Sequence, residues 1–294
     1  VPGAPATLSD AGFPHEFFPF ADTNNFHPYS TTAVWDPPDW YSLTHTWQAA
    51  ELPDLDQRNQ FVLGYLLYNV TDYLFNQLGF DGMRIDSVPY APKWFYTMLT
   101  AHLHTRVNGV FAIGEVNLGP KPYATPDFYA GYQTDSQMGK KVPVLDSVLN
   151  FAAFQTLRAV FGMAAWAPAP GTPEVAAPRP MTELAAKLQE IRTVFSDPGV
   201  LGNFIDNHDV PRFLFYRDDA TLLQNALAVT FGMEGIPIVY YGTEQLMNTG
   251  LIEGGRALPA GATNADNVNR YPMWMWQTHF AAQRAGIKGM GAWI

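Results

Sequence analysis

The amino-acid sequence contains no cysteine, so disulfide bonds and metal sites with thiolate ligands are excluded. Charged residues make up only 15% of the chain, and 27 Asp and Glu outnumber 17 Lys and Arg. Because no basic run occurs, a nucleic-acid backbone is not an expected partner. No stretch approaches the roughly 20 apolar residues of a membrane-spanning helix, so no membrane partner is expected either. A neutral polymer fits this charge balance.

Hydrophobic residues, by contrast, make up 47% of the chain, which is enough to bury a sizeable core. Aromatic residues reach 14%, and their flat apolar faces suit pyranose rings, although core packing uses most of them. Composition therefore permits a carbohydrate-binding function without indicating one. It leaves the compartment undetermined.

Hydrophobic periodicity predicts strands that alternate with helices, which is typical of an α/β fold with a parallel sheet. Residues 1–54 are rich in Pro, Asp, Asn and aromatic residues without a clear period, and residues 164–180 read as a loop of Ala and Pro. The predicted strands are 79–86, 110–115, 145–151, 202–206 and 236–241, and the predicted helices are 59–78, 181–194 and 220–233.

The run FDGMRID at residues 80–86 carries the most information about chemistry. Because side chains alternate along a strand, Arg84 and Asp86 share one face, while Met83 and Ile85 face a packed layer. An arginine so close keeps an aspartate ionised at neutral pH, as a nucleophilic carboxylate requires. The same pair also occurs as an ion pair that merely closes a strand, so this motif alone leaves both interpretations open.

Two further carboxylates follow the ends of other predicted strands. Glu115 comes after an apolar run in which Gly114 allows backbone or ligand to approach closely. Its apolar surroundings predict a raised pKa, as a general acid working near neutral pH requires. Asp209 ends the run LGNFIDNHD, and Pro211 prevents the strand from continuing. An isolated NHD is most often a turn or a cap, but three carboxylates at three strand ends indicate a site.

In order and near the expected spacing, these motifs resemble those of the alpha-amylase family of glycoside hydrolases, family 13, and above all its fungal and other eukaryotic members. The resemblance covers residues 13–276. The motifs that carry it are FHPY at 26–29, LPDLD at 52–56, FDGMRID at 80–86, GEV at 114–116, FIDNHDVPRF at 204–213 and GIPIVYYGTEQ at 235–245.

The resemblance implies a partial (β/α)8 TIM barrel made of strands four to eight with their helices. The family's Asn-His strand has no counterpart between residues 1 and 26, and its C-terminal β-sandwich has none after residue 294. We therefore expect residues 1–54 to be a remnant of domain B, and residues 55–294 to be the C-terminal part of the catalytic barrel. The active site of such a barrel lies at the carboxyl ends of its strands, where Asp86, Glu115 and Asp209 fall.

The resemblance also implies roles for these residues. Asp86 matches the nucleophile that forms a covalent glycosyl-enzyme, Glu115 the acid/base, and Asp209 the carboxylate that stabilises the transition state, with Arg84 and His208 assisting. A retaining glycosidase needs its nucleophile and acid/base about 5 Å apart, which neighbouring parallel strands can supply. The implied reaction is endo-hydrolysis of α-1,4-glucosidic bonds in starch- or glycogen-type α-glucans.

Two alternatives stay open. An α-glucosidase or an α-glucan transglycosylase keeps the same three carboxylates and differs in loops that one sequence does not interpret. A non-catalytic carbohydrate-binding relative usually loses the carboxylates, whereas all three are intact here.

Other sugar-contacting positions match the family less completely. Asp266 and Arg270 in DNVNR stand four residues apart, as in a donor-side subsite of the fungal enzymes, although such a pair is also common as a surface ion pair. Where amylases commonly carry a Lys-His pair, this chain has Pro89 and Tyr90. Tyr90 is either a residue that stacks on a sugar or a packing aromatic.

Calcium is the cofactor that the resemblance implies. Asp54 matches a calcium-binding aspartate, and the backbone carbonyl of Tyr90 could replace that of the usual His. The family's Asn ligand is absent, and Asp36 and Asp39 are the nearest candidates for a further acidic ligand. Since calcium takes about six to eight oxygens, we expect a weak or empty site.

Three further expectations follow from the resemblance. The protein is expected to be secreted and monomeric. An isolated chain without the first three strands exposes unpaired sheet edges and part of its core, so we expect it to be aggregation-prone and poorly active.

Overall fold

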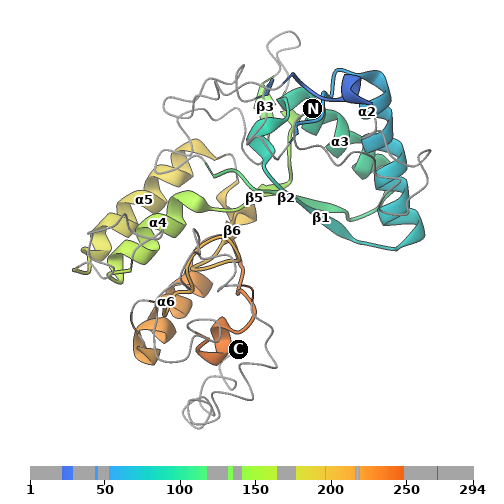
Figure 1. The fold of residues 1–294 in the computed structure, drawn as a ribbon. Helices are drawn as coiled ribbons and strands as arrows, with labels where there is room; N and C mark the ends of the chain where they lie inside the picture. Colours follow the sequence, from blue (N-terminus) through green and yellow to red (C-terminus); the bar gives the residue numbers. More distant parts are fainter. Residues whose placement is uncertain are drawn as a thin grey trace. The chain divides into compact units, whose positions relative to one another are not determined.

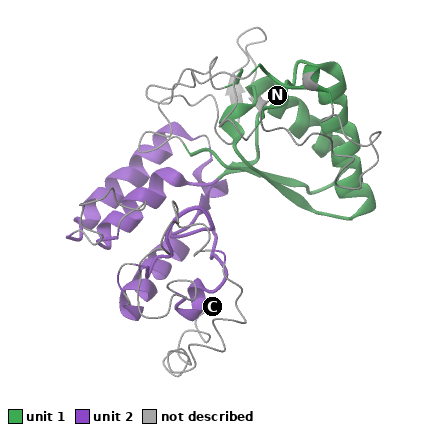
Figure 2. Ribbon diagram, in the orientation of Figure 1, with its two compact units in different colours: residues 1–118, 122–148 green, residues 119–121, 149–294 purple. Residues whose placement is uncertain are grey.

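A computed structural model of the protein (Figure 1) describes residues 22–28, 44–45, 53–117, 132–134, 141–163, 177–195, 197–215, 217, 219–247 and 270. The chain divides into two compact units (Figure 2). The first contains residues 1–118 and 122–148, and the second contains residues 119–121 and 149–294. None of the helices in the described ranges is long and apolar enough to cross a membrane.

The first unit is built on a parallel sheet with the strand order β1-β2-β5. Strand β1 spans Gly82–Ile85, β2 spans Phe111–Gly114 and β5 spans Ser147–Val148. Ile85 pairs with Gly114, and the Glu115 amide donates to the Ile85 carbonyl at 2.8 Å. This register brings the carboxyl ends of β1 and β2 to one edge of the sheet.

Helical segments flank this sheet. Asn59 caps α2 (Gln60–Gly64), and the helix continues in π-helical turns as η5 (Tyr65–Val70) and η6 (Tyr73–Gln77). The Thr71 hydroxyl donates to the Leu67 carbonyl within these turns, competing with backbone donors for that acceptor. After the short η7 (Val88–Tyr90), helix α3 (Lys93–Arg106) connects β1 to β2.

A short antiparallel pair, β3 (Tyr132–Thr134) with β4 (Lys141–Pro143), also belongs to the first unit. The sequence pattern did not predict it. Its residues lie between the predicted strands 110–115 and 145–151, where no periodicity was recognised.

The second unit pairs strand β6 (Gly202–Asn203) with β7 (Ile236–Pro237) in parallel. Three helices, α4 (Phe151–Val160), α5 (Met181–Val194) and α6 (Ala220–Gly232), belong to it, and α4 lies along α5 (Figure 1). Phe154 and Phe204 stack with ring centroids 4.7 Å apart in the core of the unit. Phe151 and Val210 complete this buried cluster.

The predicted α/β class and the five predicted parallel strands are confirmed, but the strands are shorter than predicted. The segment predicted as strand 145–151 ends at Val148, because the Asn150 side chain accepts the Ala153 amide and starts α4 at Phe151. Strand β7 ends at Pro237, although the next amide, that of Ile238, still donates to the Asn203 carbonyl at 2.7 Å. The helices predicted at 59–78, 181–194 and 220–233 are present.

The predicted domain boundary at residue 54 stays a prediction, since the structure describes few residues before it. Residues 164–176 of the predicted Ala- and Pro-rich loop lie outside the described residues.

A close approach at Gly114 is confirmed, but the groups that approach are side chains, whereas the sequence predicted backbone or ligand. A Cβ at this position would lie 2.5 Å from Leu145 Cδ1 and 2.8 Å from Val88 Cγ2. We expect Gly114→Ala to lower the free energy of unfolding by about 1–3 kcal/mol through overpacking. Urea denaturation measures this change.

The matched control is Gly64→Ala, where a Cβ has nothing within 4 Å and the backbone is helical. It should raise the free energy of unfolding by about 0.5–1 kcal/mol. Equal effects of the two substitutions would contradict the packing argument.

Candidate active site

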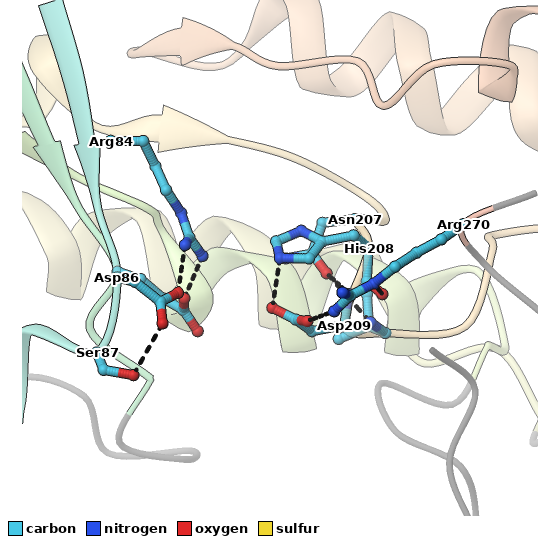
Figure 3. A network of polar contacts seen from close by, with 9 residues as sticks. Arg84, Asp86, Ser87, Asn207, His208, Asp209 and Arg270 are labelled. Atoms are coloured by element: carbon cyan, nitrogen blue, oxygen red, sulfur yellow. Dashed lines mark hydrogen bonds and ion pairs between the residues drawn. The ribbon is translucent and has the colours of Figure 1, made fainter. Parts of the chain in front are cut away.

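Arg84 joins two carboxylates at the carboxyl ends of neighbouring strands of the first unit. Its Nη1 donates to Oδ1 of Asp86, and its Nη2 donates to Oε2 of Glu115. Figure 3 shows the contacts of Arg84 and Ser87 with Asp86 as dashed lines. The predicted proximity of Arg84 and Asp86 is confirmed. The second contact, to Glu115, was not predicted, because it depends on the register of β1 and β2.

The electrostatics of this group leave Asp86 acidic. Burial raises the pKa of Asp86, but a hydrogen bond from Glu115, the positive charge of Arg84 and the Ser87 hydroxyl together outweigh burial, and the pKa is lowered. The Asp86 side chain is 65% exposed, whereas that of Glu115 is 15% exposed. An ionised, accessible carboxylate therefore lies beside a more enclosed one, and Arg84 contacts both.

The chain turns sharply directly after Asp86. Ser87 has φ of 49°, in the left-handed region that residues other than glycine rarely adopt. Its hydroxyl donates to Oδ2 of Asp86 at 3.2 Å. Such conformations cluster at functional sites, where the surrounding structure holds them.

A second polar group lies in the second unit, around Asp209 (Figure 3). His208 Nε2 lies 3.0 Å from Oδ2 of Asp209, and Arg270 Nη2 donates to Oδ1 at 2.8 Å. The Asn207 side chain accepts the backbone amides of Asp209 at 2.8 Å and Val210 at 3.1 Å. The Asp209 carboxylate thus has a basic side chain on each of its two oxygens.

Of the three predicted catalytic carboxylates, the structure brings together Asp86 and Glu115 and places Asp209 in the other unit. The contact between Arg270 and Asp209 was not predicted, because the sequence pairs Arg270 with Asp266. Asp266 lies outside the described residues. The spacing of residues 209 and 270 gives no local signal for their contact.

A cavity of about 530 Å³ lies next to β1, and Arg84, Asp86 and Ser87 form part of its wall. Tyr90 also lines it; burial and the charge of Asp54 raise the pKa of its phenol to about 12. Tyr90 is only 8% exposed. The rest of the wall is mainly apolar and includes Leu55, Leu66, Val70, Met83, Ile85, Phe95 and Leu99.

Asp54, the predicted calcium ligand, lines the same cavity. Its Oδ2 is buried without a hydrogen-bond partner and lies 3.8 Å from His27 Nε2. Burial, followed by the charge of Asp56, raises the pKa of Asp54 to about 8. An unsatisfied carboxylate oxygen of this kind suits a cation.

The described residues do not complete a calcium site. No group of three or more His, Cys, Asp or Glu side chains is placed to hold a metal within the described part of the chain. Asp36 and Asp39 lie outside that part. Asp54 and the carbonyl of Tyr90 supply too few of the roughly six to eight oxygens that calcium takes.

Comparison with known proteins places these residues in a family context. The family model for the alpha amylase catalytic domain matches residues 17–288. The chain is 27% identical over 262 residues to alpha-amylase 1 of Schwanniomyces occidentalis, which covers 88% of this chain and 42% of that protein. It is 28% identical over 197 residues to a cyclomaltodextrin glucanotransferase of Paenibacillus macerans, covering 67% of this chain and 24% of that protein.

Among solved structures, an alpha-amylase from Malbranchea cinnamomea superposes with a TM-score of 0.65 at 26% identity. The match covers 92% of this chain and 47% of that one. The chain therefore spans less than half the length of these relatives.

The raised pKa of Asp54 predicts a pH-dependent stability. The folded pKa, about 8, lies above the ordinary value of 3.8, so between these values the folded chain keeps a proton that the unfolded chain has released. The stabilisation is complete below about pH 4 and is lost as the pH rises towards 8. We expect the free energy of unfolding to fall by up to about 1.4 kcal/mol per pH unit in this window, and to fall less steeply in Asp54→Asn.

Urea denaturation at several pH values measures both slopes. Asp219→Asn is the control, because an asparagine can still cap α6 as Asp219 does by accepting the Leu222 amide. Its slope should match that of the wild type. Equal slopes in the wild type and Asp54→Asn would contradict a proton held on Asp54.

Proposed function

Because the chain belongs to the alpha-amylase family of glycoside hydrolases, we propose that it carries the retaining hydrolysis of α-1,4-glucosidic bonds within starch- or glycogen-type α-glucans. One observation carries the proposal. Asp86 and Glu115, which directly follow the ends of neighbouring parallel strands, share the guanidinium of Arg84, and the pair combines an ionised carboxylate with an enclosed one.

In the proposed reaction, an Asp86 oxygen attacks the anomeric carbon while Glu115 donates its proton to the departing glycosidic oxygen. The glycosidic bond breaks and a covalent glycosyl-enzyme forms on Asp86. Glu115, now ionised, takes a proton from water, and the water oxygen attacks the anomeric carbon and releases Asp86. Two inversions give net retention of the α-configuration.

The environment of Asp86 supports its role, because the Arg84 contact and the lowered pKa of Asp86 keep the nucleophile ionised at neutral pH. The Glu115 side chain is more enclosed, at 15% exposed, and also contacts Arg84. That Glu115 holds a proton before the reaction is part of the proposal.

Asp209 is the proposed third carboxylate, whose negative charge would stabilise an oxocarbenium-like transition state. His208 and Arg270 contact its two oxygens and are proposed, with Asp266, to contact the sugar as well. Tyr90 is proposed to line the product side of the site from its place in the cavity wall.

We further propose that β1, β2, β5, β6 and β7 are strands four to eight of a (β/α)8 barrel, with residues 1–54 as a domain B remnant. Three parallel ladders with intervening helices, and the superposition on part of the Malbranchea cinnamomea alpha-amylase, support this assignment. Secretion, a monomeric state and slow turnover by the isolated chain stay predictions.

A second candidate is glycosyl transfer, in which a sugar hydroxyl instead of water releases the glycosyl group from Asp86. The similarity to a cyclomaltodextrin glucanotransferase favours it. The two reactions share the first step and differ in the products.

The decisive test uses Glu115→Gln with starch and with α-maltosyl fluoride. We expect hydrolysis of starch to fall by about 10²–10⁴-fold, because the glutamine cannot donate a proton. Fluoride leaves without that proton, so the variant should accumulate a maltosyl group on Asp86, detected by peptide mass spectrometry. Because the adduct needs only one turnover, slow catalysis does not hide it.

Glu183→Gln, on the exposed face of α5, is the control and should behave as wild type. Asp86→Asn should form no adduct. Products of the wild type that keep the α-anomeric form indicate retention, and longer products with little free sugar indicate transfer. Starch binding without adduct or turnover would replace the enzyme proposal with a non-catalytic one.

A further inference from the structure

The loop that carries His208 and Asp209 begins at Asp206, and the buried Asp206 carboxylate also contacts the other end of the loop. Oδ2 of Asp206 accepts the backbone amide of Phe213 at 2.9 Å, seven residues further along the chain. The Thr243 hydroxyl lies 2.9 Å and 3.0 Å from the two Asp206 oxygens. Asp206 is 1% exposed, so these hydrogen bonds form away from water.

A buried arginine from α4 joins the same two ends of the loop. Arg158 Nη1 donates to the carbonyl of Ile205 at 2.8 Å and to that of Pro211 at 3.0 Å. Its guanidinium lies 5.7 Å from the ring centroids of both Phe154 and Phe213. Arg158 is fully buried, and such hydrogen bonds from a charged group are stronger than neutral ones.

Burial raises the pKa of Asp206. Arg212, the Phe213 amide, Arg158 and the Thr243 hydroxyl reduce this rise without cancelling it. Asp206 and Arg158 thus connect the two ends of the loop independently, one through an amide and the other through carbonyls.

Removing either side chain would leave buried backbone groups unsatisfied, which favours a rearranged loop. Other groups also hold the loop: the Asn207 side chain accepts the amides of Asp209 and Val210, the Arg212 guanidinium donates to the Tyr241 carbonyl, and Arg270 donates to Asp209. The position of the Asp209 carboxylate therefore depends on these groups and also on Asp206 and Arg158, which do not touch it.

We propose that Asp206 and Arg158 are positioning residues that hold the loop 206–213 in the conformation in which Asp209 acts on the substrate. This inference rests on the proposed function, because it takes Asp209 as the carboxylate that supports the transition state. Neither residue contacts the substrate in this assignment. Their effect on the reaction passes through the loop.

The test compares Asp206→Ala and Arg158→Met with the conservative Asp206→Asn, which keeps an acceptor oxygen for Phe213. Two readouts are needed. Hydrogen exchange with mass spectrometry follows the peptide 204–213 against the peptide 181–194 of α5. Steady-state kinetics with α-maltosyl fluoride separates kcat from KM.

We expect amide exchange in 204–213 to rise at least about tenfold in Asp206→Ala and Arg158→Met, while α5 keeps the wild-type rate. In both variants kcat should fall by about 10²-fold, because a misplacement of about 1 Å costs that much, and KM should change little. Asp206→Asn should lie nearer the wild type in both readouts.

Leu223→Ala is the control for a general loss of stability, since Leu223 is buried in α6 and has no part in the loop contacts. It should lower the melting temperature without a selective rise in loop exchange. Exchange that rises equally in α5 and in the loop, or a mobile loop with unchanged kcat, would overturn the positioning role.

The inference and the proposed function fail in different ways. If Glu115→Gln forms no adduct and the wild type shows no turnover, the proposed function fails, and the positioning role falls with it. If the wild type is active and the variants keep both loop exchange and kcat, only the positioning role is overturned.

Discussion

The parallel pairing of β1 with β2 is the constraint on which the first unit depends. Because side chains alternate along a strand, a slip of one residue would turn Glu115 away from Asp86 and Arg84. Backbone hydrogen bonds and side-chain packing both hold the register of β1 and β2. The Glu115 amide donates to Ile85, the Glu115 carbonyl accepts the Val88 amide at 3.1 Å, and Gly114 lets Leu145 and Val88 pack against the strand. Backbone geometry, more than the carboxylates themselves, therefore determines how the two acids meet.

In both units, an arginine side chain contacts a candidate carboxylate. In a chain with a formal net charge of −10, each candidate carboxylate group has a guanidinium of its own, Arg84 in the first unit and Arg270 in the second. The buried Oδ2 of Asp54 has no hydrogen-bond partner, and burial, followed by the charge of Asp56, raises the pKa of Asp54. The contrast between Asp86 and Asp54, which line one cavity, shows how neighbouring aspartates acquire opposite protonation preferences.

Structural features that depend on residues close together in the sequence were predicted from the sequence pattern. The helix at 181–194 follows from its periodicity, and the approach of Arg84 to Asp86 follows from strand alternation. Strand ends were predicted less well, because Asn150 starts a helix where apolar residues continue. The contacts of Arg270 with Asp209, and of Arg158 with Ile205 and Pro211, join residues about 50 to 60 positions apart, as their separations of 61, 47 and 53 record. No periodicity within one segment encodes such pairings.

The left-handed turn at Ser87 has a consequence for how this position can vary. A β-branched side chain is strongly disfavoured at φ near 49°, whereas Gly, Asn and Asp accept it. Among proteins that keep this backbone conformation, position 87 should therefore be occupied by Ser or by residues such as Gly, Asn and Asp, whatever substrate each protein uses. The residue found at this position would therefore reflect the conformation of the main chain. It would be a poor guide to differences in substrate specificity.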